Sequence, residues 1–344
     1  MAALDIVSPN RTTTYYKDKL KTLAEIFGTD DVELEADSLR VMDRRYPVVN
    51  DVIVLVEPPK YSPFVRQALG TTSAGVGTSD FAEDEQYSFG EEWTRYSVIR
   101  PEHERTFRRY FDLVELGSLR DKRVCDLGCG NGRWSWFLKD VCRELVLVDF
   151  SDGIFAAREN LRDIGSCLFF QGDITDLPFA DDFADFIVCL GVLHYLPTPA
   201  LEELRRLRRL APAHLYCVYY ALDNRPRYFR ALLRLVTGLR LGVSRVRSPG
   251  FRKQFSRGVV VLVYLPLLAA GRVLDRLGLG DRVPLNEGYR ENRSLRVLEQ
   301  NAYNRFFNRI EQRVTHQEVE ALRDTFGEVV ISEQLPYWHF LCRR

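Results

Sequence analysis

The sequence has no net charge, no paired set of cysteines and no long apolar run. Its 344 residues carry 48 Lys and Arg against 48 Asp and Glu, so it lacks the overall basic charge of many nucleic-acid-binding proteins. We therefore expect no nucleic-acid partner. The seven cysteines are an odd number, and four of them lie inside apolar, strand-like runs. This pattern predicts buried thiols and a cytoplasmic location.

Apolar stretches are also short. The longest, Gly258–Gly271, has 14 residues and contains a proline, whereas a membrane-spanning helix needs about 20. The opening residues lack the continuous apolar core of a secretory signal. With 46% hydrophobic and 28% charged residues, the composition is that of a globular protein, and the length suggests about two domains. The sequence thus predicts a soluble, folded protein.

The zero net charge hides an uneven distribution. Residues 205–257 contain 14 Arg or Lys and one acidic residue, Asp223. The first 130 residues contain 17 basic and 23 acidic residues. The basic segment mixes its arginines with Leu and Val rather than with stacking aromatics, which also argues against nucleic acid as its partner.

A regular alternation of strands and helices begins at Lys122. Short β-rich runs recur with helical stretches between them, which predicts an α/β fold with a mostly parallel sheet covered on both faces. The five predicted strands are Arg123–Leu127, Glu144–Val148, Cys167–Gln171, Asp185–Leu190 and His214–Ala221.

The C-terminal tail is predicted to complete this core. Thr315–Glu318 is a capping box that opens a short helix. Two strands follow, Glu328–Ser332 and Tyr337–Cys342, and the intervening Leu335-Pro336 favours a hairpin between them.

The rest of the chain divides into further segments. Residues 1–60 are predicted as a small N-terminal α+β domain that begins with a helix at Tyr16–Phe27. Residues 61–100 are predicted as a linker and pre-core segment, because Gly, Ser and Thr are frequent up to residue 80. The α/β core is assigned to 101–222 and 301–344, and a helical insert to 223–300.

The strongest chemical signal is a glycine-rich run, Val124-Cys-Asp-Leu-Gly-Cys-Gly-Asn-Gly-Arg133, between a predicted strand and a helix. Glycines at 128, 130 and 132 let the backbone turn sharply and approach a ligand closely. A dinucleotide fingerprint would place its last glycine at Arg133, and no Gly-Lys-Ser/Thr follows for a P-loop. A tight strand-to-helix turn without a ligand is the alternative.

Three more predicted strands end in residues suited to a nucleoside. Asp149 ends its strand with a carboxylate that can accept two hydrogen bonds from a ribose diol. Asp173 follows the next strand and can meet an adenine amino group. The strand Asp185–Leu190 opens into a loop. Because ligands of open parallel sheets bind outside the carboxyl ends of the strands, we expect one ligand site across these ends.

In this order and spacing, the four motifs resemble those of the class I, Rossmann-like S-adenosylmethionine-dependent methyltransferases. The resemblance covers roughly residues 120–222 and 315–344. It implies a seven-stranded, mostly parallel sheet with an antiparallel last strand, and S-adenosylmethionine as the cofactor. The residues implied to bind it are Asp126, Gly128, Cys129 and Gly130 of the loop, Asp149, Phe150, the adenine-contacting Asp173 and Ile174, Leu190 and Trp93.

Two flanking segments also resemble parts of relatives. Gln86–Tyr96 is similar to an F-G-x-x-W segment that packs over the cofactor in some members, with Trp93 as its tryptophan. The first 60 residues resemble a zinc-ribbon domain that often precedes such cores. No cysteine occurs before Cys125, so the four-thiolate zinc site cannot be built and no bound metal is expected.

Methyl transfer is an in-line displacement in which the protein orients and desolvates the reactants and sometimes supplies a base. His194 is the candidate base because it follows the fourth core strand, and Tyr195 is a weaker candidate on the same grounds. The alternative for His194 is packing or capping of its loop. Leu190-Gly-Val-Leu stands where some relatives have Asn-Pro-Pro-Tyr, which disfavours methylation of planar amino groups.

The sequence therefore predicts methyl transfer to a small-molecule acceptor, at a hydroxyl in preference to nitrogen or carbon. A non-catalytic protein that binds the cofactor is the alternative from another class. The insert 223–300 is compatible with a lid over a hydrophobic acceptor, with a homodimer interface, or with peripheral membrane contact through 223–280. Its mixture of apolar and basic residues leaves these three roles open.

Overall fold

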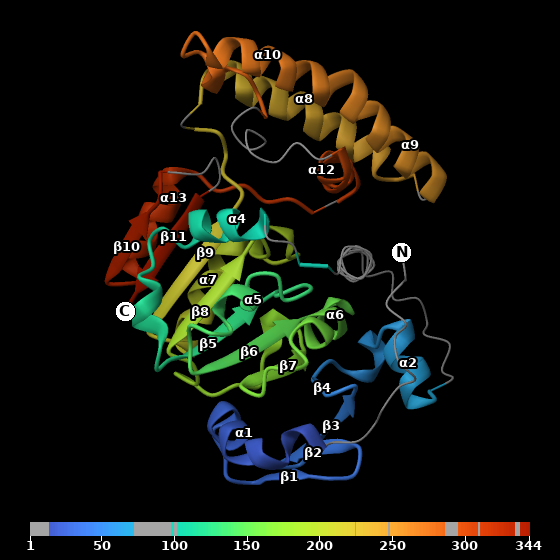
Figure 1. The fold of residues 1–344 in the computed structure, drawn as a ribbon, viewed down its shortest axis with the longest axis vertical. Coiled ribbons are helices and arrows are strands. Elements are labelled where there is room, and N and C mark those ends of the chain that lie inside the picture. The colour runs from blue at the N-terminus through green and yellow to red at the C-terminus, as the bar shows by residue number, and fades with distance from the viewer. Residues whose placement is uncertain are drawn as a thin grey trace. The chain divides into compact units, whose positions relative to one another are not determined.

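The computed structural model describes residues 14–71, 98–99, 102–223, 225–246, 248–285, 295–308, 310–333 and 338–344. These residues form two compact units. The first contains the described residues up to Val218 together with Ala321–Ser332 and His339–Arg344. The second contains Tyr219–Glu320 and Glu333–Trp338. Figure 1 shows the sheet that organises the first unit and the long helices that organise the second.

The first unit is built on one sheet, in which the strand order is β1-β2-β3-β4-β7-β6-β5-β8-β9-β11-β10. Its central strands pair in parallel and are almost entirely buried, because helices cover both faces. They correspond to the five predicted strands. They are β5 (Arg123–Leu127), β6 (Glu144–Asp149), β7 (Cys167–Gln171), β8 (Phe186–Leu190) and β9 (Ala213–Val218).

The C-terminal strands complete a seven-stranded core. β10 (Glu328–Ile331) and β11 (Trp338–Arg343) pair antiparallel, and β11 lies beside β9. The prediction of a mostly parallel α/β sheet with an antiparallel last strand is therefore confirmed. The helix α13 (His316–Glu320) begins at the predicted capping box. The turn predicted at Leu335-Pro336 lies outside the described residues.

Four N-terminal strands extend the core sheet. They are β1 (Val32–Leu34), β2 (Ser38–Val41), β3 (Arg44–Val49) and β4 (Val52–Val54). β4 is fully buried and pairs in parallel with β7, with Ile53 opposite Phe170. The segment 1–60, predicted as a domain of its own, is thus joined to the core by strand pairing.

Helices of the first unit include one inside the predicted linker. That helix, α2 (Pro63–Leu69), is capped by the Ser62 hydroxyl, which accepts a hydrogen bond from the Val65 amide at 3.1 Å. The Gly-, Ser- and Thr-rich run begins only after it, so the predicted linker started too early. The predicted N-terminal helix is present as a 3-10 turn and an α-helix. The bounds are η1 (Thr14–Lys19), α1 (Leu20–Phe27), α4 (Glu102–Tyr110), α5 (Ser135–Leu138), α6 (Gly153–Asn160) and α7 (Ala200–Leu207).

The second unit is mostly helical, and it extends beyond the predicted insert 223–300 because residues 301–320, assigned to the core from the sequence, belong to it. A long helix consists of α9 (Pro249–Val259), a π-helical turn (Val260–Tyr264) and α10 (Leu265–Asp275). It is accompanied by α8 (Arg227–Val243) and α12 (Leu295–Phe307). Residues of the π-helical turn and of α10 pack with residues of α12 in a small apolar core.

The long helix exceeds the apolar run seen in the sequence. Among the described residues, it is the one helix long and apolar enough to cross a membrane, judged by length and composition only. The qualifying segment Gly250–Asp275 has 26 residues, and the mean hydropathy of its most apolar 18-residue window is 1.8. Only 22% of that window is buried inside the structure. The helix continues through Arg257 and Arg272, which stand at the two ends of the apolar run. The 14-residue length of that run therefore underestimated the length of the helix.

Candidate functional site

The glycine loop lies between β5 and α5, where the sequence predicted it. Gly128, Gly130 and Gly132 have positive φ angles of 75°, 55° and 73°, a region that residues with a side chain rarely adopt. A Cβ atom on Gly128 would lie 2.3 Å from Cγ2 of Val192. The loop therefore packs directly against the segment that follows β8, and both conformation and space require glycine at 128.

Asp149, at the end of β6, holds the glycine loop through its backbone. Its Oδ2 accepts a hydrogen bond from the Gly130 amide at 2.7 Å. Its Oδ1 accepts hydrogen bonds from the amide and the hydroxyl of Ser151, at 2.8 and 2.6 Å. Burial raises the pKa of Asp149, and these hydrogen bonds oppose the rise. One carboxylate thus organises two loops at the carboxyl edge of the sheet.

Asp126, near the end of β5, lies beneath the glycine loop and is only 1% exposed. Its Oδ2 accepts a hydrogen bond from Oγ of Ser135 at 2.6 Å, which ties the strand to the start of α5. Burial raises the pKa of Asp126 to about 7, opposed by the Ser135 hydrogen bond and reinforced by the charge of Asp149. The side chain supports the loop from below.

Replacing Asp126 with asparagine is expected to flatten the pH dependence of stability. The folded-state pKa of about 7 lies above the ordinary value of 3.8. Between about pH 4 and pH 7, the folded state therefore binds more protons, and the free energy of unfolding falls by up to about 4 kcal/mol as the pH rises. The neutral amide in Asp126→Asn binds no proton in this range, so this variant should not lose stability in this way as the pH rises. Urea unfolding at both ends of this range measures the difference, and equal slopes in the two proteins contradict the raised pKa.

Gln171 ends β7 and offers a hydrogen-bond acceptor that the sequence reasoning missed. Its Nε2 donates to the carbonyl oxygen of Phe150 at 3.3 Å and to Oδ1 of Asp152 at 3.2 Å. Its Oε1 is buried and has no hydrogen-bond partner among the described residues. A buried oxygen of this kind is costly unless a ligand group donates to it. Its place at a strand end was the signal that could have identified it.

Asp173 and Ile174 follow β7 as predicted, and Ile174 is buried at the start of the turn η4 (Ile174–Asp176). Oδ2 of Asp173 forms an ion pair with Nζ of Lys60 at 3.1 Å. Lys60 also lies 6.0 Å from the ring centre of Phe150. No sequence pattern indicated Lys60, because it belongs to an N-terminal turn whose position depends on the pairing of β4 with β7.

The turn η5 (Leu193–Tyr195) follows β8 and carries both predicted catalytic residues. His194 is fully buried, and its ring centre lies 4.3 Å from that of Tyr195. Leu190, at the end of β8, is also buried. Through Val192, the same segment packs on the glycine loop. The structure therefore places the predicted catalytic turn directly beside the predicted cofactor loop.

Nine of the ten residues predicted to bind the cofactor lie in the described part of the chain, at or just after the carboxyl ends of β5, β6, β7 and β8. Among them, Cys129 is buried within the glycine loop, and burial raises the pKa of its thiol well above the ordinary value. Trp93 and the aromatic segment around it lie outside the described residues. A single edge of the sheet thus gathers all nine.

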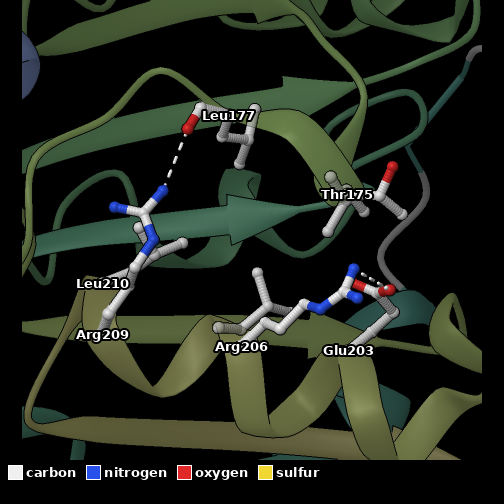
Figure 2. Close-up of a pocket in the computed structure, with 8 residues that line it drawn as sticks. Thr175, Leu177, Glu203, Arg206, Arg209 and Leu210 are labelled. Carbon is white, nitrogen blue, oxygen red and sulfur yellow. Dashed lines mark hydrogen bonds and ion pairs between the residues drawn. The ribbon is translucent and has the colours of Figure 1, made fainter.

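A cavity of about 250 Å³ is lined by residues of η4, α7 and the turn η6 (Arg208–Leu210). Figure 2 shows Arg206 beside Glu203 and Arg209 donating to the carbonyl oxygen of Leu177, each at 3.0 Å. The cavity shares Ile174 with the predicted adenine site, but its lining does not include the glycine loop, Asp149 or His194. It therefore borders the candidate site and does not contain its chemistry.

A known protein family matches the residues that form this edge of the sheet. The family model described as "Methyltransferase domain" matches residues 124–212, which include the glycine loop, Asp149, Asp173 and His194. Residues 124–212 are a methyltransferase domain. Its fold is the Rossmann-like fold of the class I methyltransferases.

Curated methyltransferases are similar to part of the chain. A fatty-acid O-methyltransferase of Mycolicibacterium smegmatis is 30% identical over 146 residues, or 41% of this chain and 48% of that protein. A provisionally named methyltransferase of Encephalitozoon cuniculi is 32% identical over 135 residues, or 38% and 59%. The chain thus spans about half the length of these relatives. Among solved structures, magnesium protoporphyrin IX methyltransferase of Synechocystis PCC 6803 is 16% identical, covers 75% of this chain and 95% of its own, and has a TM-score of 0.40.

The described residues fit S-adenosylmethionine. The positive φ angles of Gly128, Gly130 and Gly132 turn the loop backbone sharply at the carboxyl edge of the sheet, where ligands of such sheets bind. Asp149 would hold the ribose hydroxyls, and the buried Oε1 of Gln171 is an acceptor without a protein partner in the described residues. These two acceptors are compatible with the hydroxyl and amino donors of this cofactor.

Proposed function

We propose that the methyltransferase domain transfers a methyl group to an oxygen atom of an apolar small molecule. The observation that carries the proposal is the packing around the glycine loop: Asp149 holds the Gly130 amide at 2.7 Å, and Val192 packs on Gly128. This packing joins the cofactor loop to the turn that bears His194. The similarity to a fatty-acid O-methyltransferase supports an oxygen on an apolar acceptor.

S-adenosylmethionine, when bound, supplies an electrophilic methyl group on a sulfonium sulfur. The chain's own residues orient the reactants and exclude water. Asp149 would accept a hydrogen bond from the ribose diol, and the buried side chains of Phe150, Ile174 and Leu190 would provide apolar surface for the adenine. Most of the rate enhancement of an in-line transfer then comes from positioning and desolvation.

Where the acceptor is a hydroxyl, His194 takes its proton in this proposal, whereas a carboxylate acceptor is already ionised and needs no base. It lies in the turn η5 directly after β8, beside the glycine loop, and imidazole is a common general base in enzymes. In His194→Gln, which cannot serve as a base, we expect kcat to fall about a hundredfold or more, with unchanged affinity for S-adenosylmethionine. Tyr195→Phe distinguishes the second candidate, because a larger fall in that variant assigns the proton to the phenol. A wild-type rate in both would mean that positioning alone suffices.

Binding and transfer assays together test the proposed function. Calorimetry is expected to show about micromolar affinity for S-adenosylmethionine and S-adenosylhomocysteine, and no binding of NADH. A labelled methyl group is then offered to a long-chain fatty acid, the corresponding amine and a hydroquinone. Label on an acceptor oxygen supports the proposal, whereas label only on nitrogen or carbon replaces it with N- or C-methylation. Cofactor binding without transfer to any acceptor favours a non-catalytic partner protein.

A further inference from the structure

The second unit exposes many large apolar side chains. Among the described residues, 19 large hydrophobic side chains are exposed, and 14 of them lie between Tyr228 and Leu279. Leu262 is 77% exposed and Leu235 is 70% exposed. Single exposed hydrophobics are normal on a soluble protein, but a concentration of them on one part of the surface marks an interaction site.

The exposed apolar residues of α8 form a stripe. Tyr228, Leu232, Leu235 and Leu239 recur three and four residues apart, so they share one face of the helix. Phe229 and Arg240, which lie about a quarter turn or more from this stripe, are buried. The side of α8 that packs inside the unit is therefore distinct from the side that carries the leucines.

The long helix α9–α10, one of the long helices visible in Figure 1, has a similar division. Val260, Tyr264 and Leu268 pack with α12, whereas Val261 and Leu262 are exposed. A helix at the centre of a soluble core would be buried on most sides. We call the exposed residues of α8 and α9–α10 together the membrane face, for the reason that follows.

Basic residues accompany the apolar ones. Residues 225–282 contain 13 Arg or Lys and two acidic residues. Arg240 forms an ion pair with Glu311 at 3.0 Å inside the unit. Arg234 on α8 and Arg276 directly after α10, by contrast, are exposed. The partner of this surface must therefore be both apolar and negatively charged.

We propose that the membrane face binds the surface of a bilayer that contains anionic phospholipid. Helices that lie in the membrane interface combine an apolar face, which enters the boundary of the acyl chains, with Lys and Arg that contact anionic headgroups. A second copy of the chain fits less well, because a two-fold contact places the same basic face against itself.

In this proposal the long helix lies in the interface, although its 26-residue segment Gly250–Asp275 is long enough to span a bilayer. Its uncharged run Gly258–Gly271 has 14 residues, or about 21 Å of helix, whereas the hydrocarbon core is about 30 Å thick. The stripe of Val260, Tyr264 and Leu268 also stays covered by α12. The docking depends on neither the acceptor nor the transfer step.

Vesicle sedimentation of the full chain tests the proposal. We expect binding to phosphatidylcholine vesicles with about a quarter phosphatidylglycerol, much weaker binding to phosphatidylcholine alone, and release by alkaline carbonate. The double variants Leu235→Gln/Leu262→Gln and Arg234→Glu/Arg276→Glu should each bind about tenfold less.

The matched controls are Met42→Gln, an apolar side chain 57% exposed in the first unit, and Arg120→Glu, an exposed arginine there. Both controls should bind as the wild type does.

Three outcomes overturn the proposal. If all variants bind vesicles equally, or if binding shows no preference for anionic vesicles, the membrane face is not the surface that binds the bilayer. Retention until detergent is added replaces interfacial binding with a span. If light scattering detects a dimer that Leu235→Gln/Leu262→Gln dissociates and that does not bind vesicles, the partner of this surface is a second copy of the chain. Calorimetry with S-adenosylmethionine on the same variants should show unchanged affinity, which separates a failure of docking from a failure of the proposed function.

Discussion

Replacing Asp149 with asparagine is expected to raise the dissociation constant for S-adenosylmethionine about ten- to a hundredfold. The carboxylate accepts hydrogen bonds from the Gly130 amide and from Ser151, and it is the residue that would hold the ribose hydroxyls. An asparagine of the same shape turns one acceptor atom into a donor, which then faces another donor. Loss of a hydrogen bond to a charged group costs about 1–3 kcal/mol, and each 1.4 kcal/mol is about tenfold in affinity.

Calorimetry on Asp149→Asn measures this change, with Asp176→Asn as the control. Asp176 is an exposed carboxylate on the turn after β7, so its replacement removes the same charge close by without touching the loop. Its affinity for the cofactor should equal that of the wild type. If Asp149→Asn is folded and binds as tightly as the wild type, Asp149 does not hold the ribose.

The second large effect is expected on stability, for Gly128→Ala. A Cβ at this position would lie 2.3 Å from Cγ2 and 2.8 Å from Cγ1 of Val192, and a β-branched valine has little rotamer freedom with which to withdraw. The φ angle of 75° adds strain of its own. We expect the free energy of unfolding in urea to fall by about 3 kcal/mol, the sum of overpacking and backbone strain.

Gly191→Ala separates the two contributions to that fall. Gly191 has a φ angle of 79°, and a Cβ there meets nothing within 4 Å. This variant should therefore lose only the strain, about 1 kcal/mol. In Gly128→Ala/Val192→Ala, the removal of both Cγ atoms should restore part of the stability. Equal losses in the two glycine variants would show that the contact between the loop and the post-β8 segment is not tight.

The core strands could be predicted from sequence because their signals are local. Each of β5 to β8 is a short apolar run with turn residues after it, and burial on both faces needs no alternation. The glycine loop and Asp149 follow directly from those strands, since a residue at the end of a parallel strand lies at one known edge of the sheet. The positions of these groups depend on neighbours a few residues away.

Features that depend on distant partners could not be predicted. Nothing in Val52–Val54 specifies β7 as its partner, and the place of Lys60 beside Asp173 depends on that pairing. The raised pKa of Asp126 depends on its burial in the folded core, and the hydroxyl of Ser135 from the next helix opposes the rise. The length of the long helix was underestimated because an apolar run was used as its measure, although a helix tolerates single arginines.

The parallel pairing of β4 with β7 has a consequence for synthesis on the ribosome. The partner of Ile53 is Phe170, which is translated roughly ten seconds after it at ordinary elongation rates. During that time the N-terminal strands have only one another, and small antiparallel units of this kind are marginally stable in water. β4 is thus made well before its partner, and it stays open to wrong partners until β7 has emerged.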